Sequence, residues 1–227
     1  MDRPVDALDE LEGNLADIEF ANRWLGGVVP VCREVRRAGA RTILDVGCSR
    51  GRFGAVLKER DPTLHLTGVE PDPEAAEQAR SHYDLVVDGY FPDALPDGAS
   101  YDCIVFNDVL EHIVDPWSVL AASVRHLAPG GTIVASIPNV RFIVVVRNLA
   151  WRGLWNYTDW GVLDRTHLRF FTRDSIEELF VGAGFRIERL TPINPARVRG
   201  AGLLVGRFRD MRYPQFAVVA RPADTGD

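Results

Sequence analysis

The chain has 227 residues, of which 46% are hydrophobic and 26% are charged, a composition typical of a globular protein with a buried core. Its formal net charge of −6 does not favour nucleic acid as a partner, because proteins that bind nucleic acid usually carry excess basic residues. The first twenty residues lack an apolar signal core. The longest apolar run, 142–146, is far shorter than the ~20 residues that span a bilayer. Three scattered cysteines without a CxxC spacing fit a reducing compartment, so we expect a cytoplasmic protein with no membrane partner.

Helical periodicity comes first along the chain. Residues 8–38 alternate apolar and charged positions, and one or two helices there are expected to cover a sheet edge or close over a ligand. Strand-like runs then alternate with helical ones. The expected strands are 42–46, 64–70, 85–87, 103–107, 132–137, 185–190 and 214–219. The expected helices are 54–60, 73–83, 116–127 and 173–183.

This alternation predicts an α/β fold of the doubly wound, Rossmann-like type with a mostly parallel sheet. The last strand is expected to pair antiparallel with the strand before it. The rhythm breaks at 140–168, an aromatic stretch that we interpret as a helical lid or acceptor region. We therefore predict a single domain, 1–227, with an N-terminal helical cap at 1–40.

The segment from Ile43 to Gly51 takes a buried strand into a glycine turn with a helix directly behind it. Glycines let the backbone approach a ligand closely, beyond the carboxyl end of the strand. Glu70 ends the next strand, 19 residues after Gly51, where a carboxylate accepts hydrogen bonds from ribose hydroxyls. The alternative is that Glu70 only caps the following helix. Both features together favour a nucleotide-type site.

Four segments resemble motifs of the class I S-adenosylmethionine-dependent methyltransferases, in the family's order. They are Ile43–Gly51, Gly68–Asp72, Tyr101–Asn107 and Leu127–Gly131. The resemblance is to small-molecule enzymes such as the ubiquinone-biosynthesis and sugar O-methyltransferases. It implies S-adenosylmethionine as the cofactor and a small molecule as the methyl acceptor.

The resemblance also implies a role for each cofactor residue. Asp45 would steady the turn or face the methionine amino group, Glu70 would hold the ribose, and Asp88 would meet the adenine. Asn107 would offer its backbone carbonyl to the methionine end. The full implied set is Asp45, Gly47, Cys48, Ser49, Gly51, Glu70, Pro71, Asp88, Gly89 and Asn107. Ser49 departs from the family, which has glycine there, so either the turn is reshaped or the hydroxyl joins the site.

Two histidines are candidates for the base that an alcohol or phenol acceptor needs, His112 and His167. If a helix begins after the strand at 103–107, Asp108, Glu111 and His112 share one face and resemble a Mg²⁺ site of ubiquinone-biosynthesis enzymes. We prefer the alternative, in which these residues are structural and no metal is bound. His167 could likewise be either the base or a buried residue that pins the lid.

The lid aromatics are candidates to line the acceptor pocket, together with one arginine: Trp151, Trp155, Tyr157, Trp160 and Arg169. Some of the aromatics could instead pack the lid onto the sheet or form a homodimer contact. Arginines 197, 199, 207, 209 and 212 are either a solvated loop or a receptor for an anionic acceptor.

The first-choice function is O-methylation of a natural product, a phenol or quinone precursor, or a sugar. N-methylation of an amino sugar or amine is the nearest alternative. An NAD-dependent oxidoreductase is disfavoured because Lys58 is the only lysine, which leaves no Tyr-x-x-x-Lys pair. A catalytically silent cofactor-binding subunit is disfavoured by the acids at 45, 70 and 88.

Overall fold

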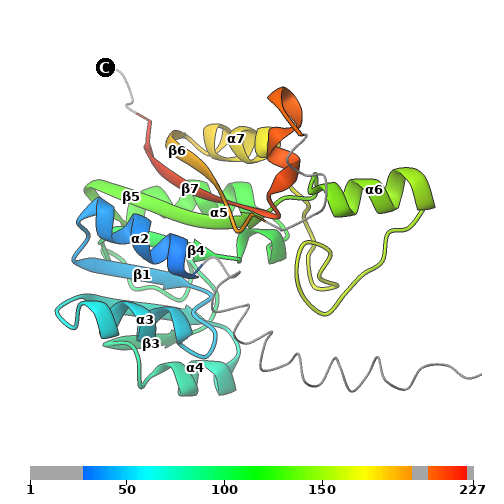
Figure 1. Cartoon of the computed structure of the whole chain (residues 1–227). Coiled ribbons are helices and arrows are strands. Elements are labelled where there is room, and N and C mark those ends of the chain that lie inside the picture. Colours follow the sequence, from blue (N-terminus) through cyan, green and yellow to red (C-terminus); the bar gives the residue numbers. More distant parts are fainter. Residues whose placement is uncertain (1–27, 196–203, 224–227) are drawn as a thin grey trace, which may run out of the picture.

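The computed structural model describes residues 28–195 and 204–223, and in this part of the chain seven strands form one sheet covered by helices (Figure 1). The strands are β1 (Thr42–Val46), β2 (His65–Glu70), β3 (Leu85–Asp88), β4 (Tyr101–Asn107), β5 (Leu127–Pro138), β6 (Phe185–Ile193) and β7 (Gln215–Pro222). The α-helices are α2 (Val28–Ala38), α3 (Arg52–Arg60), α4 (Pro73–Ala79), α5 (Pro116–Ser123), α6 (Ile143–Arg152) and α7 (Arg173–Gly182). Short 3₁₀ turns are η1 (Leu110–His112), η2 (Val124–His126) and η4 (Gly206–Arg212).

The strand order is β3-β2-β1-β4-β5-β7-β6. Strands β1 to β5 are parallel to their neighbours, and β7 is antiparallel to both β5 and β6. The predicted Rossmann-like sheet with an antiparallel C-terminal strand is therefore confirmed. The carboxyl ends of β1, β2 and β4 meet at one edge, where the order reverses between β1 and β4. In open α/β sheets, ligands bind at such a reversal.

Two layers of helices bury the sheet from opposite faces. Apolar side chains of α2, α3 and α4, such as Val35, Leu57 and Ala79, form one core with the strands. Those of α5 and α7, such as Leu120 and Phe180, form the other. Strands covered on both faces need apolar side chains in both directions, which explains why β1 and β4 are near-continuous apolar runs.

The expected elements differ from the structure mainly at their ends. The predicted helix 73–83 ends at Ala79, the predicted helix 116–127 becomes 3₁₀ after Ser123, and the predicted strand 132–137 extends over 127–138. The region 140–168 holds one helix, α6, which extends away from the sheet (Figure 1). The division into cap, lid and single domain stays a prediction. Only α2 and the turn after it, from the predicted cap at 1–40, lie within the described residues. Among the described helices, none is both long enough and apolar enough to cross a bilayer.

Two helical glycines should respond to alanine with opposite signs. A Cβ on Gly54 in α3 would lie 2.5 Å from the buried ring of Tyr83, whereas a Cβ on Gly182 in α7 would meet nothing within 4 Å. We expect Gly54→Ala to lower the free energy of unfolding by about 2 kcal/mol through overpacking. Gly182→Ala should raise it by roughly 0.5–1 kcal/mol through helix propensity. Urea unfolding measures both, and a stabilised Gly54→Ala variant would contradict the packing of Tyr83.

Candidate active site

The glycine turn after β1 has a backbone that side chains rarely adopt. Gly47 has φ 71°, and its N–H donates to the carbonyl of Val69 at 2.8 Å. A Cβ on Gly47 would lie 2.8 Å from the side chain of Val109, and one on Gly51, which has φ 86°, would lie 2.8 Å from the Cα of Ala79. Strand ends and helices thus crowd the turn from both sides, and glycine is required at both positions.

Ser49 has a backbone conformation that glycine adopts more readily than other residues. Its φ is 48°, a left-handed conformation that serine adopts at some cost. The compensation is a hydrogen bond, because the N–H of Ser49 donates to Oε2 of Glu70 at 2.9 Å. The serine therefore leaves the turn in a left-handed conformation and aims its amide at the acid on β2.

Glu70 lies at the carboxyl end of β2 and is 9% exposed. Its Oε1 accepts from the N–H of Asp72 at 3.0 Å, and its Oε2 accepts from Ser49. Asp72, and not Glu70, is the N-cap of α4, since it accepts from the amides of Glu74 and Ala75. Each carboxylate oxygen of Glu70 keeps a lone pair for another donor. Beside it on β3, Asp88 is in register with Glu70 and pairs with Arg80 at 2.9 Å.

Asp45 lies under the turn and is 2% exposed. The hydroxyl of Tyr83 donates to its carboxylate and accepts from the N–H of Gly54 at 3.0 Å. Burial raises the pKa of Asp45 to about 7, and the nearby Glu70 adds to this while the Tyr83 hydrogen bond opposes it. Asp45 therefore joins the turn to α3 through Tyr83. Sequence patterns do not single out Tyr83, whose role depends on this tertiary contact.

The raised pKa of Asp45 makes stability depend on pH. Between its ordinary value of 3.8 and about 7, the unfolded chain releases this proton while the folded chain keeps it. The free energy of unfolding should therefore fall by about 3 kcal/mol between pH 5 and pH 8 because of this group. Asp45→Asn cannot titrate, so urea unfolding should show that its stability relative to the wild type rises over the same interval. Parallel pH profiles of the two proteins would contradict the assignment.

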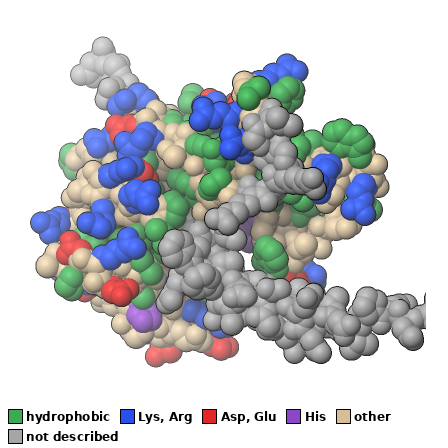
Figure 2. Space-filling model, viewed as in Figure 1, with side chains coloured by type: hydrophobic (Ala, Val, Ile, Leu, Met, Phe, Trp, Pro, Cys, Tyr) green, Lys and Arg blue, Asp and Glu red, His purple; other side chains and the backbone are tan. Residues whose placement is uncertain are grey.

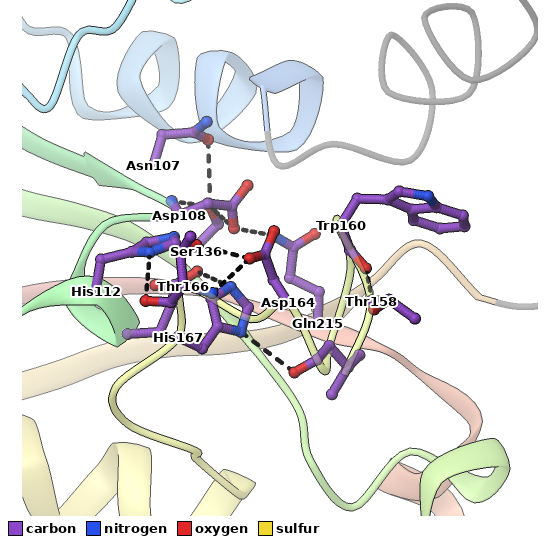
Figure 3. Close-up of polar contacts among 12 residues, drawn as sticks. Asn107, Asp108, His112, Ser136, Thr158, Trp160, Asp164, Thr166, His167 and Gln215 are labelled. Atoms are coloured by element: carbon purple, nitrogen blue, oxygen red, sulfur yellow. Dashed lines mark hydrogen bonds and ion pairs between the residues drawn. The ribbon is translucent and has the colours of Figure 1, made fainter. Parts of the chain in front are cut away.

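A polar network continues from the end of β4 across the sheet (Figure 3). Asp108, with φ 58°, receives hydrogen bonds from the Ser136 hydroxyl at 2.9 Å and from the side-chain amide of Gln215. Gln215 in turn accepts from Asn194 at 2.8 Å. The Ser136 hydroxyl also lies 3.2 Å from the side-chain oxygen of Asn107. The network joins the ends of β4, β5, β7 and β6 at the edge that holds the glycine turn.

Beyond Asp108, the helix that would place it on one face with Glu111 and His112 does not form. The chain makes the single 3₁₀ turn η1, and Glu111 and His112 gather with His167 instead. Nε2 of His167 lies 3.8 Å from Oε1 of Glu111, and the two histidine rings meet edge to face at 4.7 Å. The backbone carbonyl of Glu111 accepts from the amides of Leu168 and Arg169 at 2.8 and 3.0 Å.

Burial governs the charge of this Glu111–His112–His167 cluster. Glu111 is 1% exposed, and burial raises the pKa of its carboxyl well above the usual range, with the charge of Asp108 adding to the shift. Burial also lowers the pKa of His167, and the neighbouring His112 contributes to the lowering. Near neutral pH, His167 is therefore a neutral imidazole, the form that accepts a proton or binds a metal.

Comparison with known proteins agrees with these motifs. A family model described as a methyltransferase domain matches residues 23–190. The chain belongs to this family. That membership corrects the alternative of an NAD-dependent oxidoreductase.

Two curated relatives and one solved structure illustrate the similarity of this methyltransferase to known proteins. A malonyl-[acyl-carrier protein] O-methyltransferase from Hahella chejuensis is 29% identical over 157 residues, 67% of this chain and 53% of the relative. A ubiquinone biosynthesis O-methyltransferase from Xylella fastidiosa (strain M23) is 32% identical over 117 residues, 48% of this chain and 46% of the relative. The chain thus spans about half the length of these relatives. The plantazolicin methyltransferase BpumL, solved in complex with SAH, superimposes with a TM-score of 0.63 at 15% identity, covering 96% of this chain and 91% of that one.

The lid aromatics of the methyltransferase have unequal surroundings. Trp155 packs edge to face on Phe170, with ring centroids 5.3 Å apart. Trp151, Tyr157 and Trp160 are 76%, 55% and 57% exposed. Figure 2 shows hydrophobic side chains over α6 with arginines beside them, and Ile143, Arg147, Trp151 and Arg152 line a hollow of about 380 Å³ there. A role of these aromatics in acceptor binding stays a prediction.

The candidate arginines divide into four groups, one of which is Arg212 alone, with its guanidinium over the ring of Tyr213. Arg169 donates from Nε to the carbonyl of Val114 at 3.0 Å and lies over the ring of Trp117, so its guanidinium holds the start of α5 and the residues just before it. Arginines 197 and 199 lie outside the described residues. Arg207 and Arg209 line a hollow of about 880 Å³ together with Arg141 and Arg173, next to the first turn of α7. Arg141 was not singled out from the sequence, and its ion pair with Asp210 at 2.6 Å anchors η4.

Proposed function

We propose that this methyltransferase transfers a methyl group from S-adenosylmethionine to a hydroxyl group of a small molecule. The observation that carries the proposal is the placement of two unlike groups along one sheet edge. The glycine turn and Glu70 follow β1 and β2, and the Glu111–His112–His167 cluster follows β4. The glycine turn and Glu70 are suited to bind a nucleoside, and the cluster is suited to promote proton removal from an acceptor.

The donor half fits S-adenosylmethionine by its chemistry. The two carboxylate oxygens of Glu70 suit the paired ribose hydroxyls, and the glycine turn lies beside this carboxylate because the amide of Ser49 donates to it. When bound, the cofactor supplies a methyl group on a positively charged sulfur. The protein's own task is to align the acceptor oxygen with that methyl carbon and to remove the proton of the hydroxyl.

The acceptor half favours oxygen over nitrogen as the methylated atom. A neutral amine has a free lone pair and needs little help, whereas a hydroxyl must lose its proton during attack. A neutral imidazole at His167 beside the buried Glu111 provides for that loss. Two of the chain's relatives are described as O-methyltransferases, which supports this choice. We also propose a cytoplasmic location, since Cys32, Cys48 and Cys103 are buried free thiols.

An acceptor screen tests the proposal. The full chain is incubated with ¹³C-methyl-labelled S-adenosylmethionine and separate pools of phenols, sugars and amines, and the products are examined by NMR. We expect a methoxy carbon on a product from a hydroxyl-bearing pool. A labelled N-methyl product alone would contradict O-methylation and leave cofactor use intact.

A further inference from the structure

The carboxyl group of Glu111 is buried without a hydrogen-bond partner. Neither Oε1 nor Oε2 has such a partner among the described residues, although the residue is only 1% exposed. An unpaired buried polar group costs free energy, and two such oxygens on one side chain are uncommon in folded proteins. This carboxyl can therefore bind a further group, and Nε2 of His167 lies 3.8 Å from its Oε1.

Both imidazoles are held in one orientation by backbone carbonyls. Nδ1 of His112 lies 3.2 Å from the carbonyl oxygen of Thr166, and Nδ1 of His167 lies 3.2 Å from that of Val162 (Figure 3). A carbonyl only accepts, so each Nδ1 carries the hydrogen and each Nε2 presents a lone pair. Metal-binding histidines are fixed in this way by a hydrogen bond from the nitrogen that does not bind the metal.

We propose that Glu111, His112 and His167 bind one divalent transition-metal ion. One ligand atom from each of the three residues already lies within 4.8 Å of the others. Ligand atoms about 2.0–2.2 Å from a shared ion are roughly 3.4 Å apart, so small side-chain movements complete the site. The loop that carries His167 is tied to Glu111 by the amides of Leu168 and Arg169, which holds the ligands together before an ion arrives.

The ligand set determines the class of metal. Two imidazoles and one carboxylate suit Zn²⁺, Co²⁺ or Fe²⁺, whereas Mg²⁺ prefers oxygen ligands in a near-ideal octahedron. In the Mg²⁺ site that the sequence suggests, Asp108 is the third ligand beside Glu111 and His112. The structure instead joins the Asp108 carboxylate to Ser136 and Gln215 and supplies His167 as the third member of the cluster. Three protein ligands leave a position open, as in catalytic sites.

The open position gives the metal a function that rests on the proposed O-methylation. An acceptor hydroxyl bound there becomes more acidic and releases its proton to water. Its oxygen then forms a bond to the methyl carbon as the carbon–sulfur bond breaks and the electron pair passes to sulfur. The products are a methyl ether, S-adenosylhomocysteine and one proton, so atoms and charge balance. Activation through the ion, with His112 and His167 as its ligands, would then replace the direct proton transfer to His167 described above, and the proposed O-methylation itself would be unchanged.

Titration of the chelator-treated full chain with Co²⁺ tests the site without any acceptor. Calorimetry and the visible absorption of bound Co²⁺ should show one equivalent bound, and Mg²⁺ in excess should not displace it. Glu111→Gln and His167→Ala should each weaken binding at least 100-fold. His65→Ala is the matched control, because His65 is exposed at the opposite end of β2, and it should bind as the wild type does.

Binding of S-adenosylhomocysteine is measured on the same samples. It shows that each variant is folded, and it tests the methyltransferase proposal separately from the metal site. If His167→Ala fails to fold, the Co²⁺ affinity of His112→Ala and the number of Co²⁺ ions bound by the wild type test the metal site in its place. A wild type that binds S-adenosylhomocysteine but not one equivalent of Co²⁺ overturns the metal site and leaves the methyltransferase proposal standing. Equal Co²⁺ binding by the wild type and the cluster variants overturns the assignment of ligands. One Co²⁺ bound to the cluster without methyl transfer to any hydroxyl supports the metal site and counts against O-methylation.

Discussion

Glu70→Ala is expected to weaken the binding of S-adenosylhomocysteine about 100-fold, because two hydrogen bonds to a charged group are lost and each contributes about 1.5 kcal/mol. The carboxylate has two tasks. It accepts from the amides of Ser49 and Asp72, which fixes the glycine turn against β2, and we propose that its remaining lone pairs accept from the ribose hydroxyls. Titration calorimetry of the purified protein measures the loss.

Glu77→Ala is the matched control for this variant. The side chain of Glu77 on α4 is 77% exposed and pairs with Arg80 at 2.9 Å, so its loss should leave the affinity unchanged. Glu70→Gln should fall between the wild type and Glu70→Ala, since the amide keeps one acceptor oxygen. Unchanged affinity in Glu70→Ala would mean that the ribose binds elsewhere.

The second large effect is expected in the chemical step. His167→Ala should slow methyl transfer at least 100-fold, the usual contribution of a group that activates a nucleophile, while the affinity for S-adenosylhomocysteine stays unchanged. Nε2 of His167 lies 3.8 Å from Oε1 of Glu111, beyond the end of β4, whereas the proposed cofactor residues Glu70 and Ser49 lie at the ends of β2 and β1. Single-turnover measurements with the acceptor found in the screen separate this step from product release.

His65→Ala is the control for the second prediction as well. His65 is exposed at the start of β2 and belongs to neither proposed half of the site. A His167→Ala variant that loses cofactor binding and transfer together would instead assign the histidine to the structure of the loop.

The strands and the donor half of the site follow from local sequence because their determinants are local. Parallel strands buried on both faces are short apolar runs, and the glycine turn comes directly after one of them. Glu70 is recognisable because it ends the next run. Its spacing from Gly51 identifies the pair without any knowledge of tertiary contacts.

The acceptor half could not be derived in the same way, because contacts between distant residues create it. Gln215 donates to Asp108 across 107 positions, and His112 meets the carbonyl of Thr166 across 54. The sequence predicts that Asp108 lies with Glu111 and His112 if a helix forms there. The chain instead makes a single 3₁₀ turn, and the third member of the cluster is His167. The role of Tyr83 could not be predicted for the same reason, because its partner Asp45 lies 38 positions away.

A crystal structure of the full chain with S-adenosylhomocysteine would show both halves of the proposed site at once. We expect the ribose hydroxyls to bind the Glu70 carboxylate and the sulfur to point toward the Glu111–His112–His167 cluster, with room for an acceptor between them. A ribose bound away from Glu70, or a sulfur that faces away from the cluster, would contradict the proposed site.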